Sequence, residues 1–386
     1  MQKGNKMQIR VLHFVTNMDR GGQETLIMNL YRNMDRDRFQ FCFLCSSKKT
    51  GHYDKEIAEL GGILYYLPER VKRHGLMALA DAHTNVLLLK EWLLANQSKF
   101  DCVHLHTSHA ADVLVHLMAC KLAGVDNVIV HSHNTQAPHP LYHKICRFLT
   151  TLFKFKRLAC GERAAEWMYG KKLVLKGVIT ILHNGIDANR FVYNPGVARL
   201  YKEQLGIADK TVYGHVGRFV IQKNHSFLID VFYEIQKIQP ESVLMLIGDG
   251  ELKKEMVAKV KRLGIDKKVL FMGVRDDVPL LLSAMDLFLF PSFHEGLSVA
   301  AIEVQCNGLP CLSSDIPAMR EAKITPLLSF RSLKDSPEQW AKSALSIAQR
   351  NVEMDTVSLI KAAQYDIKQS VEIIEKVYVQ LVNNKV

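Results

Sequence analysis

Short apolar runs alternate with segments of helical periodicity along this chain, and this alternation limits its possible folds more than any other feature. Apolar runs of about four to eight residues bounded by turn residues are typical of buried strands. When such strands alternate with helices, they predict a parallel sheet covered by helices on both faces. The strands predicted in the first half are residues 9–16, 39–45, 62–67, 101–106, 127–132, 157–160 and 178–182. The helices predicted between them are residues 22–33, 53–60, 77–96, 110–122, 141–154 and 162–170.

A polar stretch containing Asn194, Pro195 and Gly196 interrupts this alternation and is a candidate linker. The alternation then restarts, with strands predicted at 211–216, 242–247, 269–272, 286–290, 310–313 and 326–329. The helices predicted among these are residues 224–237, 250–263, 277–284 and 297–306. The segment from 336 to 384 has helical periodicity without a strand signal. A chain of 386 residues is long enough for two domains, and we predict two doubly wound α/β domains, 1–190 and 191–365.

The composition is that of a globular protein with an anionic partner. Apolar residues make up 48% of the chain and charged residues 23%. The net charge of +11 favours a nucleotide, a nucleic acid or an acidic membrane face, and charge alone does not choose among them. No apolar run approaches the length of about 18 residues that spans a bilayer.

The N-terminal segment and the cysteines point to an intracellular setting. The run from residue 9 to 15 contains Arg10 and His13, so we interpret it as a first strand rather than a signal peptide. The eight cysteines show no spacing typical of a metal site or a disulfide framework, and we expect buried free thiols. The expected location is cytoplasmic.

Polar residues and glycines follow several predicted strands, and ligands bind at the carboxyl ends of strands in such folds. Gly21 and Gly22 lie between the first strand and the first helix, where backbone N–H groups can meet a phosphate. A plain β–α turn explains the same glycines equally well. His131 and His133 end the strand at 127–132 and suit hydrogen bonding to a substrate. His104, His106 and His109, at the end of the strand at 101–106, form a second such cluster that ranks below the first. A histidine metal pair has no adjacent carboxylate or cysteine ligand there, and a structural role stays open.

The second half has two further junctions of this kind. Arg218 ends its first strand and Lys223 opens the next helix, a spacing that suits a diphosphate, although solvated surface cations are the usual alternative. Gly248 follows the next strand, and a tight turn with a capping Asp249 is the simpler explanation there.

The segment 286–317 places two carboxylates around one strand–loop–helix junction. Glu295 lies in the loop, and Glu303 lies nearly two turns into the helix that follows, so the two do not form a compact carboxylate pair. Glu295 could face a reacting sugar, and Glu303 could accept hydrogen bonds from a ribose. A salt-bridged surface glutamate is the alternative for Glu303.

The stretch 142–158 combines an apolar stripe with basic residues. The stripe consists of Ile145, Phe148, Leu149 and Leu152, and the cations outside it are Lys144, Arg147, Lys154, Lys156 and Arg157. A core-packed helix with a solvated basic face and a helix lying on an anionic membrane surface both fit this pattern.

Taken together, these motifs resemble the retaining glycosyltransferases of family 4. Glu295, Gly296, Leu297 and Ser298, followed by Glu303, reproduce that family's E-x7-E pattern. Its other motifs occur in the family's order between about residues 8 and 320. They are Gly21-Gly22, His133, the segment HNGID at 183–187, Gly217-Arg218 with Lys223-Asn224, and Gly248-Asp249-Gly250. The Ser at position 298 departs from the Pro or Gly that relatives often have.

The resemblance implies the GT-B architecture, with two Rossmann-like domains facing a central cleft. The first domain would lie on the acceptor side, the second would hold the donor, and a C-terminal helix at about 366–386 would pack back on the first. The implied catalytic residues, in contact with the transferred sugar, are His133 and Glu295. The implied donor-binding residues are Gly21, Gly22, Arg218, Lys223, Gly248, Val274, Gly296, Leu297, Ser298 and Glu303.

Within that set, Arg218 and Lys223 would hold the diphosphate with the Gly22 backbone, and the N–H groups of 296–298 would meet phosphate or sugar. Glu303 would bind the ribose and the Val274 region the base. The resemblance implies no bound metal and no cofactor, because cations and helix dipoles stabilise the leaving diphosphate.

These residues predict the transfer, with retention, of a hexose or N-acetylhexosamine from a UDP-sugar to a glycan or lipid-linked acceptor in cell-surface polysaccharide assembly. The stretch 142–158 would then dock on the inner face of the plasma membrane. Loops 68–76 and 134–142 are the predicted acceptor groove. The alternatives are a non-catalytic nucleotide- or nucleic-acid-binding module, or another GT-B enzyme such as a sugar-nucleotide epimerase or a phosphorylase.

Overall fold

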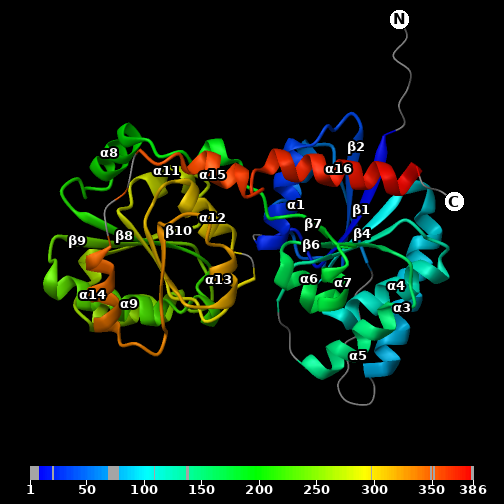
Figure 1. Ribbon diagram of the computed structural model, residues 1–386, viewed down its shortest axis with the longest axis horizontal. Coiled ribbons are helices and arrows are strands. Elements are labelled where there is room, and N and C mark those ends of the chain that lie inside the picture. The colour runs from blue at the N-terminus through cyan, green and yellow to red at the C-terminus, as the bar shows by residue number, and fades with distance from the viewer. Residues whose placement is uncertain are drawn as a thin grey trace, which may run out of the picture. The chain divides into compact units, whose positions relative to one another are not determined.

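The structure is a computed structural model that describes residues 8–19, 21–67, 78–107, 109–135, 139–296, 298–347, 350 and 353–383. The chain forms two compact units (Figure 1). Unit 1 is Met1–Gly185 with Ile367–Val386, and unit 2 is Ile186–Asp366. The boundary predicted from the sequence lies between residues 190 and 191.

Unit 1 is built on seven described parallel strands in the order β3-β2-β1-β4-β5-β6-β7. The strands are β1 (Ile9–Val15), β2 (Phe39–Cys45), β3 (Ile63–Tyr66), β4 (Cys102–Thr107), β5 (Val128–Ser132), β6 (Lys156–Ala159) and β7 (Thr180–Ile181). The helices are α1 (Gly22–Asn33), α2 (Asp54–Glu59), α3 (Ala78–Asn96), α4 (Ala110–Leu122), α5 (Pro140–Thr150), α6 (Glu162–Tyr169), α7 (Lys171–Leu175) and α16 (Ile367–Asn383). The strand order reverses between β1 and β4, which makes their carboxyl ends the topological switch point.

Helix α16 covers one face of this sheet beside α1 (Figure 1). Its buried residues recur every three or four positions, so one helical stripe enters the core; they are Ile367, Ser370, Val371, Ile374, Val377 and Tyr378. The Tyr378 ring packs against Phe39 and Phe41 of β2. A Cβ on Gly185 would lie 2.9 Å from Cα of Ile367, so the glycine lets the chain approach the first turn of α16 closely.

Unit 2 is built on six described parallel strands in the order β10-β9-β8-β11-β12-β13. The strands are β8 (Thr211–Val216), β9 (Ser242–Ile247), β10 (Val269–Gly273), β11 (Leu287–Phe290), β12 (Cys311–Ser314) and β13 (Leu328–Arg331). The helices are α8 (Pro195–Gln204), α9 (His225–Ile238), α10 (Lys253–Arg262), α11 (Val278–Ser283), α12 (Val299–Cys306), α13 (Pro317–Glu321), α14 (Pro337–Ser346) and α15 (Thr356–Ala362). Here the order reverses between β8 and β11.

These two sheets confirm the predicted fold class, and all eight cysteines are free and buried as their spacing indicated. The predicted linker at residues 194–196 is wrong, because α8 begins at Pro195. The Asn194 side chain accepts a hydrogen bond from the Val197 N–H at 3.1 Å, and Pro195 occupies the first turn. Asparagine followed by proline is a helix-start signal, which the polar composition of the segment obscured.

Two predicted helical segments are also corrected. Residues 336–384 contain three separate helices, α14, α15 and α16. The stretch 142–158 is not one helix, because α5 ends at Thr150 and Lys156 begins β6. Near that end, the Thr151 hydroxyl donates to the Phe148 carbonyl at 2.6 Å, a local bond that competes with helix continuation.

The core-packed interpretation of 142–158 is wrong as well, since Ile145, Phe148 and Leu152 of its apolar stripe are exposed. Among the described helices, none combines the length and the hydropathy needed to cross a membrane.

Candidate active site

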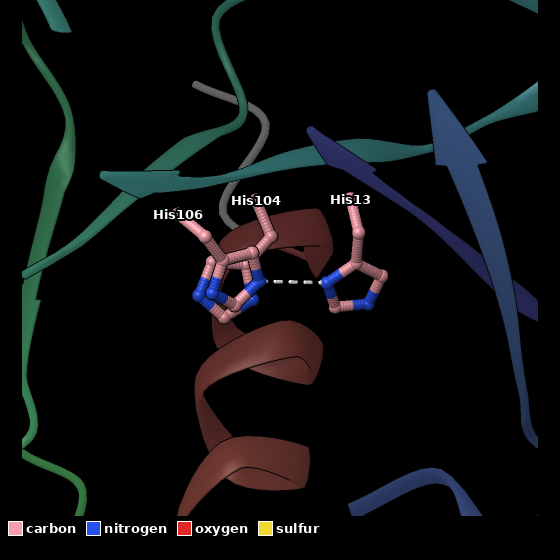
Figure 2. A group of neighbouring side chains, drawn as sticks. All are labelled: His13, His104 and His106. Atoms are coloured by element: carbon pink, nitrogen blue, oxygen red, sulfur yellow. Dashed lines mark hydrogen bonds between the residues drawn. The ribbon is translucent and has the colours of Figure 1, made fainter. Parts of the chain in front are cut away.

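Five histidines from β1, β4 and the end of β5 gather on one face of the unit 1 sheet. His13 pairs in register with His104, and His106 with His131. Side chains two residues apart share a face of a strand, which places His133 beside His131. His13, His104 and His131 have no exposed surface, and His106 and His133 are each 8% exposed. Figure 2 shows three of these rings side by side above α16, where the Tyr378 hydroxyl lies 2.8 Å from Nδ1 of His104.

His106 is the centre of a hydrogen-bonded chain of three imidazoles. Its Nε2 lies 2.9 Å from Nδ1 of His13, and its Nδ1 lies 2.9 Å from Nε2 of His133. Three neutral rings carry three N–H groups, and the two hydrogen bonds use two of them. The third N–H therefore lies at one end of the chain, on Nε2 of His13 or on Nδ1 of His133. Nδ1 of His133 can therefore donate a hydrogen bond in one state of the chain and accept one in the other. All three tautomers change together when the chain switches between these states.

These rings are neutral near pH 7. Burial lowers the pKa of His13 and His133 to about 3, and lowers the pKa of the other three well below 6.5, with the neighbouring histidines adding to the effect. A neutral cluster supplies hydrogen bonds rather than proton uptake at this pH.

Two overlapping histidine trios also have metal-ligand spacing. Ring nitrogens of His13, His104 and His106, and those of His106, His131 and His133, lie within 4.8 Å of one another. The structure thus adds a third nitrogen ligand to the metal pair considered from the sequence. Two histidine ligands of a tetrahedral zinc, with Zn–N bonds of about 2.0–2.1 Å, would lie about 3.3 Å apart. The 2.9 Å separations fit a shared proton better than a shared metal ion.

His133 and His131 differ in their position on β5. His131 lies inside the strand, and both of its ring nitrogens are buried without a hydrogen-bond partner among the described residues. His133 follows the last residue of the strand, and Nδ1 is the nitrogen that its hydrogen bond to His106 leaves unused. Of the two, His133 is therefore the ring at the strand end, although its Nδ1 is also buried.

Gly21 and Gly22 form the amino end of α1. Gly21 is the N-cap, with an extended backbone. Gly22 has open space where a Cβ would lie, so no contact within the described chain requires a glycine there. This leaves the close approach of a ligand as a reason for Gly22.

A partly buried ion pair joins two strand-end loops of unit 2. Nζ of Lys223, which follows β8, lies 2.7 Å from Oε1 of Glu295, which follows β11, and the two side chains are 17% and 6% exposed. Gln222 donates to the His294 carbonyl at 2.9 Å, and the Asn224 amide donates to the Pro291 carbonyl at 3.1 Å. The sequence assigned Lys223 and Glu295 to separate groups of a donor, and the structure brings them into direct contact.

Arg218 and Gly248 lie at the neighbouring ends of β8 and β9. Arg218 is exposed, and no ion pair joins it to another residue in the described ranges. Gly248 has a φ of +138°, and a Cβ there would lie 2.1 Å from the Gly217 carbonyl oxygen. The close packing of the two loops thus accounts for Gly248. Asp249 accepts from the Gly250 N–H at 2.7 Å, whereas the N-cap of α10 is Leu252, so the turn interpretation holds without helix capping by Asp249.

Ser298 is the N-cap of α12, and Gly296 precedes it in the loop, so both lie at the amino end of a helix. Leu297 lies outside the described residues. Glu303 occupies the second turn of α12. Part of the Glu303 surface is exposed, but burial of its carboxyl group raises its pKa to about 7. The positive charge of Arg190 lowers this pKa, and the effect of burial is the larger of the two.

Val274 follows β10 at the same edge of the sheet and is 53% exposed. A cavity of about 730 Å³ in unit 2 lies at the opposite edge, where its lining includes Thr211 and Leu287, the first residues of β8 and β11. None of the predicted site residues lines this cavity, and the strand-end cluster is the better candidate because ligands bind at carboxyl ends in this architecture.

The residues singled out from the sequence did not include His13 or Gln222, and His106 was ranked below His133. The alternation of histidines on β4 and β5 was a usable signal, because residues two apart share a face. His109, grouped with His104 and His106 from the sequence, instead caps α4 by accepting from the Ala111 N–H at 3.1 Å.

The chain is similar to known proteins along most of its length. The family profile described as "Glycosyltransferase Family 4" matches residues 20–190, and the one described as "Glycosyl transferases group 1" matches residues 198–325. The putative glycosyltransferase EpsF of Bacillus subtilis is 34% identical over 88% of each chain. The UDP-Gal:alpha-D-GlcNAc-diphosphoundecaprenol alpha-1,3-galactosyltransferase of Escherichia coli is 26% identical over 81% of each chain. Among solved structures, Anabaena HepE in complex with UDP-glucose superposes with a TM-score of 0.74 at 18% identity, covering 97% of this chain and 100% of that one.

Proposed function

Since this chain belongs to glycosyltransferase family 4, we propose that it transfers a hexose or N-acetylhexosamine from a UDP-sugar to a lipid-linked glycan with retention. The chain is a glycosyltransferase of polysaccharide biosynthesis with the GT-B fold. Two of the similar proteins support the two substrate classes. One relative uses UDP-galactose and a diphosphoundecaprenol acceptor, and HepE binds UDP-glucose.

The observation that carries the proposal is the partly buried ion pair of Lys223 and Glu295 at the carboxyl edge of the unit 2 sheet. A lysine that is 17% exposed and held 2.7 Å from a carboxylate is fixed in position before a ligand arrives. An ordered cation needs little reorganisation when negative charge develops next to it, which is the main requirement for expelling a diphosphate. The exposed Arg218 guanidinium adds a planar fork for phosphate oxygens.

The chemical step follows from this division of charge. The bond between C1 of the sugar and the diphosphate oxygen breaks, and its electron pair leaves with UDP. The acceptor hydroxyl forms a bond to C1 on the same face, and its proton passes to an oxygen of the departing phosphate. Lys223, Arg218 and the N–H groups at the start of α12 stabilise the leaving group, and Glu295 faces the positive charge that develops on the sugar.

His133 contributes neutral hydrogen bonding to a sugar hydroxyl. Its low pKa makes it a poor proton acceptor at neutral pH, and the chain through His106 lets it donate or accept without becoming charged. Glu303 accepts hydrogen bonds from the ribose, the Val274 region lines the base, and the Gly21–Gly22 backbone approaches a phosphate.

The reaction in this proposal uses no metal ion, because protein cations do the work of charge neutralisation. Because the histidine trios have metal-ligand spacing, the absence of a metal requirement needs a test. Activity is measured after treatment with EDTA and with added Zn²⁺ or Mg²⁺. Unchanged turnover supports the proposal, and loss that a metal restores contradicts this part of it.

The decisive experiment measures UDP release from a panel of UDP-hexoses and UDP-N-acetylhexosamines in the presence of an undecaprenyl-diphosphate glycan extract. One donor should give acceptor-dependent turnover, and NMR of the product should show the anomeric configuration of the donor. Inverted product would refute retention alone. Tight UDP binding without turnover of any donor would favour the binding-module alternative, and a free epimerised UDP-sugar would favour the epimerase.

A further inference from the structure

Helix α5 turns its apolar side to the solvent. Leu141, Phe148 and Leu152, just beyond its last turn, are 73%, 70% and 76% exposed, and Tyr142 and Ile145 are each 55% exposed. The spacing of residues 141, 145, 148 and 152 places them on one helical stripe. We call these five side chains the α5 stripe. Scattered exposed apolar residues are ordinary, but a contiguous row of large ones marks an interaction surface.

The inward side of α5 is fixed by polar contacts. Nδ1 of His143 accepts from the Ala110 N–H at 3.2 Å, and its Nε2 lies 3.1 Å from the Trp167 carbonyl. The His143 ring stacks on the Trp167 indole, with centroids 4.0 Å apart. Arg147 donates to the same carbonyl at 3.1 Å. These contacts hold the helix in one rotation, with His143, Cys146 and Thr150 buried and the α5 stripe facing outward.

Within the chain segment that carries the stripe the charges have a single sign, although the exposed Asp112 of α4 lies near Tyr142. From Asn127 to Gly161 the sequence contains no aspartate or glutamate. The cations of this segment are Lys144, Arg147, Lys154, Lys156 and Arg157, of which Lys144 and Lys154 are exposed. An apolar row bordered by unpaired cations is complementary to lipid tails beneath anionic head groups.

Another basic helix shows that this arrangement is not a consequence of a basic sequence. Helix α10 of unit 2 carries Lys253, Lys254, Lys259, Lys261 and Arg262. Its apolar Met256 and Val260 are buried and Val257 is partly buried. The exposed residues of the helix are Lys254, Glu255, Ala258, Lys261 and Arg262. The large apolar residues of α10 therefore pack into the core of unit 2, whereas those of the α5 stripe are exposed.

We propose that α5 docks the protein on an anionic lipid bilayer, with the α5 stripe among the head groups and acyl-chain ends and with Lys144 and Lys154 on lipid phosphates. The helix would lie in the plane of the membrane surface and would not cross it. The inference stands on exposed residues of unit 1 and is tested without turnover, so its failure would leave the proposed reaction unaffected.

The test is flotation of the purified full chain with vesicles of phosphatidylcholine containing about 30% phosphatidylglycerol, and with phosphatidylcholine alone. The protein should float with the anionic vesicles, and raised salt should weaken binding. Leu141→Gln/Phe148→Gln/Leu152→Gln should reduce the bound fraction by at least about tenfold, because inserted apolar area drives such binding. Lys144→Glu/Lys154→Glu should also reduce the bound fraction at least about tenfold, since cations close to an anionic membrane surface attract it directly.

Matched controls separate this surface from general stickiness and from the charge of the whole protein. Val192→Gln/Leu200→Gln/Ile238→Gln removes three exposed apolar side chains of unit 2, and Lys261→Glu/Arg262→Glu reverses two exposed charges of α10. Both should float like the wild type, and thermal melting should show that all variants are folded.

Three results would overturn the proposal. They are no flotation of the folded wild type, equal loss in the control variants, or flotation that survives both sets of α5 substitutions. Light scattering tests the alternative occupant, a second copy of the chain. If the wild type is a dimer that does not bind lipid, and the triple glutamine variant is a monomer, the stripe is a dimer interface.

Discussion

The strand-end clusters of the two units share an architecture but differ in electrostatics. In unit 1, five histidines on neighbouring strands are buried and neutral, and three of them form a hydrogen-bonded chain. In unit 2, the corresponding edge holds the ion pair of Lys223 and Glu295 and the exposed Arg218. A parallel sheet presents its carboxyl ends in both units, and the side chains placed there decide which ligand group each edge suits. In the proposed reaction, the neutral edge would bind hydroxyl groups and the charged edge would bind the diphosphate.

The largest expected effect tests the charged edge. Lys223→Met should lower kcat/KM by about 10²–10³-fold, because the loss of one preorganised group facing transition-state charge costs about 3–4 kcal/mol. It also leaves Glu295 buried without its partner, which destabilises the fold. Lys223→Met/Glu295→Gln should recover melting temperature without recovering turnover.

The matched control is Lys259→Met. Lys259 is 13% exposed and lies 2.6 Å from Asp230, away from the strand ends. It should lower stability and leave kcat/KM nearly unchanged. Equal activity losses in Lys223→Met and Lys259→Met would show that the strand-end pair has no special role.

An intermediate effect tests the neutral edge. His106→Phe removes the hydrogen bond to Nε2 of His133, and it should lower kcat/KM by roughly tenfold, which corresponds to the loss of one net hydrogen bond of about 1.4 kcal/mol. His104→Phe removes an equally buried ring that bonds Tyr378 instead, and it should affect stability more than turnover. Long-range ¹H–¹⁵N spectra should show that the hydrogen bond at Nε2 of His133 is lost in the first variant and kept in the second. An Nε2 signal of His133 that is the same in both variants would contradict the hydrogen-bonded chain.

The smallest effect concerns Glu303, whose pKa is raised to about 7. Only the ionised carboxyl accepts two hydrogen bonds from ribose hydroxyls, so KM for the UDP-sugar should fall a few-fold between pH 6 and 8. Glu303→Gln should remove this dependence. A pH profile of KM that is identical in the wild type and the variant would exclude Glu303 from the donor site.

The same carboxyl affects stability with the opposite trend. Its pKa is higher in the folded than in the unfolded chain, so the folded state binds more protons between about pH 4.5 and 7. The wild type should therefore lose stability relative to Glu303→Gln as pH rises through that window, and the difference should level off above pH 7.

The sequence by itself determined the elements and the fold class. The strands at residues 39–45, 211–216 and 242–247 and the helices at 22–33 and 110–122 were predicted with their observed bounds, because apolar period, caps and turn residues act over short distances. It also placed His133, Lys223 and Glu295 at strand ends. The helix start at Asn194 and the end of α5 were missed, since a few local hydrogen bonds decide them.

The tertiary structure alone decided which residues meet. Lys223 and Glu295 are 72 residues apart in the chain, and His13 and His106 are 93 apart, yet each pair is in hydrogen-bond contact. Strand order brings them together, and no local pattern encodes that order. The outward rotation of α5 was likewise undecided in the sequence, because an amphipathic pattern shows that one face is apolar but not which face meets the protein. Contacts of His143 with other helices settle that choice.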